Sequence, residues 1–104
     1  MAWFVLVLSG LMETVWATSL AQTDGFRRPV PTAVFLVALV LSMAGLAFAL
    51  RELPVGTAYA VWTGIGAVGT AIFGMVALGE PVTVARIVCL GLIVSGIVGL
   101  KVLH

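Results

Sequence analysis

The sequence predicts an all-α membrane protein with four transmembrane helices, and two observations lead to this fold class. The chain has 104 residues, of which 62% are hydrophobic and only 9% are charged, with a mean hydropathy of +1.28. Soluble domains carry about 25% charged residues, so this composition excludes them. The apolar residues also form four runs, each long enough to cross a bilayer core of about 30 Å. The runs are residues 2–20, 32–50, 55–78 and 82–103.

Short polar connections separate these runs. They are residues 22–29, 51–54 and 79–81, and each contains the Gly or Pro residues that mark turns. The first run is not expected to be a cleaved signal, because it lacks a basic leader and carries an acid inside its apolar stretch. Without a long loop or a soluble domain, any binding site must be built from the helices. Four helices leave little room to enclose a ligand, so we expect an oligomer.

The positive charges give the chain almost no preferred orientation. With four spans, one side of the membrane carries Arg51 and Lys101, and the other carries Arg27, Arg28 and Arg86. Three against two is nearly balanced under the positive-inside rule. A chain of this kind can insert both ways, and two opposed copies would then form an inverted-repeat transporter from two chains. A single orientation with a chance balance of charges agrees equally well with the count.

Glu13 is the residue that most strongly indicates function. It lies inside the apolar run, and on a helix that begins near Ala2 it falls roughly 16 Å along the axis, near the middle of the bilayer. A charged residue at a helix centre costs about 2.5 to 3.5 kcal/mol, so such residues usually serve a substrate or proton path. The alternative is a protonated Glu13 that hydrogen-bonds a neighbouring helix and serves packing alone.

Aromatic and hydroxyl side chains accompany this carboxylate. Trp16 lies one turn from Glu13 and too deep for an interfacial anchor, so we interpret it as a cavity wall. Ser42, near the centre of the second run, either contributes to a site or returns its hydroxyl to its own backbone. The third run carries a polar and aromatic stripe that is not typical of a lipid-facing surface, made by Tyr59, Trp62, Thr63 and Gly66.

Glycines are concentrated in the third and fourth runs. Gly64, Gly66 and Gly69 permit either close packing alone or packing together with a bend of the helix. The fourth run has a small residue at every fourth position, which is the pattern of close helix association. These residues are Gly91, Ser95 and Gly99, and we assign them to dimer packing.

The sequence offers little for other chemistry. Its one cysteine, Cys89, cannot form an intrachain disulfide, and its one histidine, His104, stands at the C-terminus. Neither a metal cluster nor a Cys/His nucleophile therefore has the residues it needs. We expect no enzyme activity, no cofactor and no nucleic-acid partner.

Together these residues resemble the small multidrug resistance family, and the resemblance covers essentially the whole chain. It rests on Gly10-x-x-Glu13 in the first run, on residues 56–66 of the third, which read GTAYAVWTGIG, and on the glycine-rich fourth run. Within the family, the chain resembles the guanidinium exporter (Gdx) type rather than the exporters of quaternary ammonium drugs. The features that indicate this type are Trp16, residues 62–66, residues 79–81 and Arg86. One departure is that residues 21–22 are Ala-Gln, where family members often have a lysine.

The resemblance implies an antiparallel, dual-topology homodimer in the bacterial inner membrane that exports guanidinium in exchange for protons. A heterodimer with a paralogue is also compatible with the sequence. Glu13 would bind the cation and the protons, and the two Glu13 carboxylates of a dimer would repel each other when ionised. The other implied roles are pocket lining and hydrogen bonding by Gly10, Trp16, Ser42, Tyr59, Trp62 and Thr63, with Ser42 and Trp62 positioning Glu13, and a pivot at Gly64 and Gly66.

The chemistry of guanidinium agrees with this implication. It is a planar cation whose N–H groups suit a carboxylate and whose faces suit aromatic walls. Three alternatives remain open at this point: an exporter of quaternary ammonium or other hydrophobic cations, a small dual-topology ion channel, and a membrane subunit that transports nothing.

Overall fold

A computed structural model describes residues 1–103 and contains four α-helices. They are α1 (Ala2–Ala21), α2 (Pro29–Ala49), α3 (Val55–Ala77) and α4 (Val84–Leu103). All four are long and apolar enough to cross a membrane, which confirms the predicted fold class of four membrane helices. His104 lies outside the described residues.

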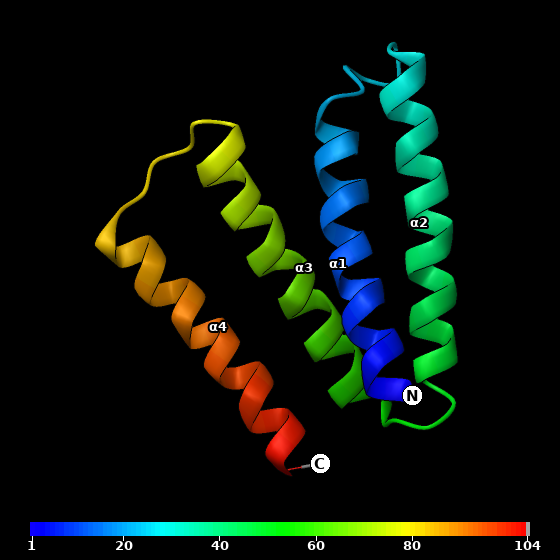
Figure 1. The fold of residues 1–104 in the computed structure, drawn as a ribbon, viewed down its shortest axis with the longest axis vertical. Helices are drawn as coiled ribbons and strands as arrows, with labels where there is room; N and C mark the ends of the chain where they lie inside the picture. The colour runs from blue at the N-terminus through cyan, green and yellow to red at the C-terminus, as the bar shows by residue number, and fades with distance from the viewer. Residues whose placement is uncertain (104) are drawn as a thin grey trace.

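The helices form a flat layer rather than a closed bundle (Figure 1). The layer measures 42 × 35 × 17 Å along its principal axes. α1 packs against both α2 and α3, whereas the backbone of α4 approaches only that of α3. Both termini and the α2–α3 connection lie at one end of the layer, and the other two connections lie at the opposite end (Figure 1).

Two helices begin at different residues from those expected, for local reasons. α2 begins at Pro29 rather than residue 32, because proline has the backbone angle of a helix and is tolerated in the first turn, where its missing N–H is not needed. α4 begins at Val84 rather than residue 82. Its first turn is capped by the Thr83 hydroxyl, which accepts a hydrogen bond from the Arg86 N–H at 3.1 Å.

The core lies among the first three helices. Buried apolar side chains from α1, α2, α3 and the α2–α3 connection form one cluster: Ala2, Leu6, Leu46, Ala49, Leu53, Ala58, Val61 and Trp62. α4 has no buried residue within the described chain and contacts this cluster through the partly buried Ile97 and Leu100. The first three helices are therefore the packed unit, and α4 is attached to its edge.

The connection between α3 and α4 carries an ion pair. The Arg86 guanidinium donates to the Glu80 carboxylate at 2.7 Å, across the connection. Both side chains are partly exposed, so the pair contributes only about 0.2 to 1 kcal/mol. Glu80 and Arg86 thus meet at the end of the layer, away from the middle of the helices.

Candidate functional site

Glu13 lies in the middle of α1 and its side chain points at α3. It rests against the backbone of Gly66, where a Cβ atom would overlap the Glu13 carboxylate. Glycine at position 66 therefore leaves the space that the carboxylate occupies. The Oε1 atom of Glu13 is buried, and no residue among 1–103 hydrogen-bonds to it. A buried carboxylate oxygen without a donor is costly, which makes it a favourable place for a proton or a cation.

Trp16 presents a second buried polar atom on the same helix. Its indole Nε1–H is buried and has no acceptor within the described part of the chain. The ring is held edge-on by Phe35 of α2, with ring centroids 6.1 Å apart, and Phe35 is in turn covered by Phe26 at 5.9 Å. Phe26 reaches this place because the α1–α2 turn has positive φ angles at Asp24, Gly25 and Phe26. α1 thus carries an unpaired acceptor and an unpaired donor one turn apart.

A buried hydrogen-bond chain joins the three packed helices. The Trp62 indole N–H of α3 donates to the Ser42 hydroxyl of α2 at 3.2 Å, and that hydroxyl donates to the Ser9 carbonyl oxygen of α1 at 2.7 Å. Ser42 therefore bonds across to α1 and not to its own backbone. In this single chain the network ends one turn before Glu13. It holds the backbone of α1 and makes no hydrogen bond to the carboxylate itself.

The two other side chains of α3 that the family resemblance assigns to a pocket are exposed in the single chain. The Tyr59 side chain is 55% exposed and lies on Trp62, with ring centroids 5.8 Å apart. Thr63 is exposed. The structure thus brings Glu13, Trp16, Ser42 and Trp62 into the packed layer and leaves Tyr59 and Thr63 at its surface.

The glycines near the site are helix contacts. Gly10 is buried against α3, where a Cβ atom would come within 2.9 Å of the Ile65 side chain and 3.3 Å of the Trp62 carbonyl oxygen. Gly64 faces the other way, towards α4, where an added Cβ atom would come within 2.9 Å of the Ile97 side chain. α3 runs without a break through residues 64–66. Close packing is therefore observed at these positions, and the pivot at Gly64 and Gly66 stays a prediction.

Two residues near the site were not assigned a role from sequence. Thr14 donates its hydroxyl to the Gly66 carbonyl oxygen at 3.4 Å, which ties α1 to α3 beside Glu13. Phe35 holds the ring of Trp16. The position of Thr14 next to Glu13 is a usable sequence signal, but Phe35 is one apolar residue among many in α2 and carries none.

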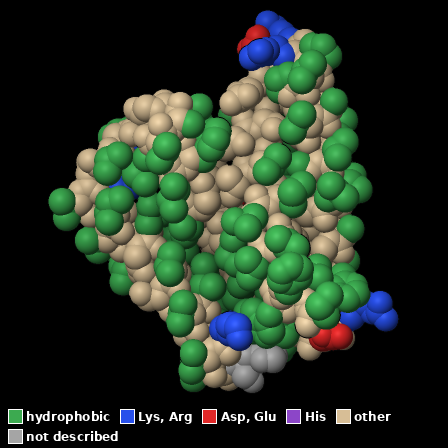
Figure 2. Space-filling view, in the orientation of Figure 1, with side chains coloured by type: hydrophobic (Ala, Val, Ile, Leu, Met, Phe, Trp, Pro, Cys, Tyr) green, Lys and Arg blue, Asp and Glu red, His purple; other side chains and the backbone are tan. Residues whose placement is uncertain are grey.

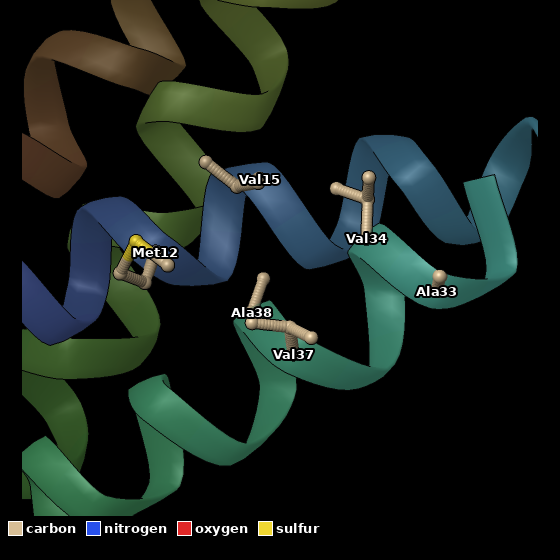
Figure 3. A pocket seen from close by; sticks show the side chains of 6 residues that line it. All are labelled: Met12, Val15, Ala33, Val34, Val37 and Ala38. Carbon is tan, nitrogen blue, oxygen red and sulfur yellow. The ribbon is translucent and has the colours of Figure 1, made fainter. Parts of the chain in front are cut away.

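An apolar cavity of about 330 Å³ lies between α1 and α2 and is distinct from this site (Figure 3). Its six lining residues are Met12, Val15, Ala33, Val34, Val37 and Ala38. None of them offers a hydrogen-bond acceptor in its side chain apart from the weak thioether of Met12. The cavity is therefore no candidate for binding a small cation. Within residues 1–103, no three His, Cys, Asp or Glu side chains gather as they do in metal sites.

Comparison with known proteins identifies the family of this chain. Residues 1–93, from the start of α1 into α4, match the family described as Small Multidrug Resistance protein. The chain is 57% identical over 101 residues to a guanidinium exporter of Yersinia pseudotuberculosis, covering 97% of each protein. It is 56% and 55% identical to guanidinium exporters of Citrobacter freundii and Salmonella typhimurium, covering 97% of this chain and 96% of each relative. This multi-pass membrane protein belongs to the small multidrug resistance family, a family of transporters.

Proposed function

We propose that this chain exports guanidinium and small guanidinyl compounds across the bacterial inner membrane in exchange for protons. The observation that carries the proposal is the buried Glu13 oxygen without a donor, in a space that Gly66 leaves open. Relatives that share more than half of its residues over nearly the full length bear the name guanidinium exporter, which supports the choice of cation.

Guanidinium suits a site built on the Glu13 carboxylate. Its planar N–H groups can donate two parallel hydrogen bonds to one carboxylate, and its charge neutralises the carboxylate in a medium of low dielectric constant. The flat cation also stacks well on aromatic faces, and Trp16 and Trp62 supply indole rings from α1 and α3. A larger cation without N–H donors would gain the charge interaction but not the paired hydrogen bonds.

Coupling follows from competition for the same carboxylate. A protonated Glu13 offers no negative charge to a cation, so the cation binds as the proton leaves. If the site opens to only one side at a time, each crossing carries either the cation or protons, and a proton gradient then drives export. No further residue is needed for this exchange.

We further propose that the working unit is an antiparallel homodimer. In one chain the site has a wall of α1 and α3 but leaves Tyr59 and Thr63 exposed. A second copy in the opposite orientation would enclose these side chains and bring a second Glu13 to the site. The near balance of positive charges between the two sides agrees with insertion in both orientations.

The test is transport by purified protein in liposomes on solid-supported membranes. The wild type is expected to give guanidinium-driven currents, and a guanidinium gradient is expected to drive protons the opposite way. Glu13→Gln removes the carboxylate with little change of size, so both signals should disappear. The matched control is Glu52→Gln, the same chemical change in the exposed α2–α3 connection, and it should leave both signals in place.

Three results would overturn the proposal in different ways. Currents that persist in Glu13→Gln would remove the central residue. A response to a bulky quaternary ammonium ion without a response to guanidinium would identify a drug exporter. Guanidinium currents that carry no opposing protons would leave a uniporter.

A further inference from the structure

A second groove lies among α1, α3 and α4, apart from Glu13. Its volume is about 240 Å³, and apolar side chains from all three helices line it, among them Trp3, Val61, Ile65, Ile97 and Val98. One lining residue is charged, Lys101 in the last turn of α4. The groove is therefore apolar along its length and has one positively charged side chain, and hydrophobic side chains cover much of the face of the molecule that Figure 2 shows.

Lys101 lies at one end of this groove, at the same end of the layer as both chain termini. Its Nζ atom lies over the ring of Trp3, 5.2 Å from the centroid. Trp3 is in the first turn of α1 and Lys101 is in the last turn of α4, and these helix ends lie at the same end of the layer (Figure 1). Tryptophan and lysine are both typical of the boundary between the acyl chains and the headgroups. Within residues 1–103, no carboxylate forms an ion pair with Lys101. The ion pair found in this range joins Arg86 to Glu80, at the α3–α4 connection.

We infer that this groove binds one anionic phospholipid, with an acyl chain along the apolar lining and the phosphate group on Lys101. Charge complementarity selects this occupant. A basic residue beside an apolar groove between membrane helices suits a phosphate headgroup. The substrate cation is excluded, since Lys101 would repel it. An apolar helix of a second copy would cover the groove but would offer no group that the charge of the exposed Lys101 attracts.

The position of the groove gives the lipid a structural role. The backbone of α4 comes close to that of α3 but not to those of α1 and α2, so few contacts attach α4 to the first two helices. A lipid acyl chain that lies along Val7 of α1, Val61 of α3 and Val98 of α4 would contact all three helices at once. Bound lipid should therefore stabilise the attachment of α4 to the packed unit.

The test is native mass spectrometry of the purified full chain with phosphatidylglycerol or phosphatidylcholine of identical acyl chains. The wild type is expected to retain phosphatidylglycerol about fivefold better than phosphatidylcholine, the preference that one lysine near a headgroup provides. Lys101→Gln should bring the two lipids to equal retention. The control is Arg51→Gln, which removes a positive charge at the same end of the protein but outside the groove. It should keep the preference.

A second variant separates the groove from the charge. Val98→Phe fills the apolar lining while Lys101 stays, and Val98 is 56% exposed, so the chain should still fold. It is expected to lower the retention of both lipids. If Lys101→Gln and Arg51→Gln lost the preference for phosphatidylglycerol equally, the lipid would be attracted by the total positive charge at this end of the protein. That result would overturn the proposed lipid site. Unchanged lipid retention in Val98→Phe, or loss of the dimer mass without loss of lipid, would assign the groove to a second copy instead.

Discussion

Three glycines of α2 and α3 and three glycines of α4 occupy opposite surroundings. Within the packed unit, a Cβ atom added to each of three glycines would overlap or crowd a polar side chain of α1. The pairs are Gly45 with Ser9, Gly66 with Glu13 and Gly69 with Thr14. On α4, a Cβ atom added at Gly91, Gly96 or Gly99 would meet no described atom within 4 Å apart from nearby residues of its own helix.

The difference shows that one residue type serves two purposes here. In lipid, no hydrophobic effect drives apolar helices together, so close packing and hydrogen bonds must hold them together. These three glycines of α2 and α3 leave the space that polar side chains of α1 occupy. The glycines of α4 have no such neighbour in the same chain. The spacing of Gly91 and Gly99 with Ser95 agrees with a contact made by a second copy, and Gly96 lies outside that stripe.

The largest effect is expected from Gly66→Ala. The added methyl group would overlap the Glu13 carboxylate. Overpacking of this kind costs about 1 to 3 kcal/mol. If most of this cost falls on the carboxylate, guanidinium affinity should fall about tenfold or more, because about 1.4 kcal/mol is a factor of ten. The measurement is the concentration dependence of guanidinium currents.

The matched control is Gly96→Ala on α4, which places the same methyl group in open space. It should transport like the wild type. Wild-type affinity in Gly66→Ala would show that the carboxylate moves away freely. The space at Gly66 would then have no importance for guanidinium binding.

A smaller effect is expected from Ser42→Ala. The change removes the acceptor of the Trp62 indole N–H and the donor to the Ser9 carbonyl oxygen, both buried. An unsatisfied buried group costs about 1 to 3 kcal/mol. Unfolding in mixed micelles should report a loss of this size. Ser95→Ala is the control, because its hydroxyl bonds only to the Gly91 carbonyl oxygen of its own exposed helix. Equal losses in the two variants would contradict a special role for the buried network.

Hydropathy was sufficient to predict four membrane helices, because each apolar run has the length of a bilayer and little else could accommodate it. Glu13 could be selected as well, since an acid in such a run is costly unless it binds a proton, a cation or a neighbouring helix. The chain of hydrogen bonds from Trp62 through Ser42 to Ser9 could not be predicted. It depends on how three separate helices are rotated about their axes, and an almost uniformly apolar helix such as α2 gives no periodicity from which to read that rotation.

The packing partners of the glycines could not be predicted from the sequence for a related reason. A small residue at every third or fourth position is the same pattern whether its partner is in the same chain or in another. Gly10 was expected to line the pocket, and the structure places it against Ile65 and Trp62 of α3. Sequence could identify where helices can approach closely. Only the arrangement of the helices shows which of these approaches one chain already uses.

The smallest effect on the chain itself, and the sharpest test of the comparison, is expected from Gly99→Leu. Because nothing lies within 4 Å of a Cβ atom there, the leucine should leave the fold and stability of the single chain unchanged. If a second copy packs on the small residues of α4, the same side chain must hold the two helices apart. Energy transfer between labelled copies in liposomes should then fall, and guanidinium transport should fall with it. Val76→Leu, at an 82% exposed position of α3, adds apolar bulk outside this face and should change neither signal. An unchanged dimer in Gly99→Leu would mean that the open glycines of α4 face lipid, and the second copy would have to meet the chain across α1 to α3.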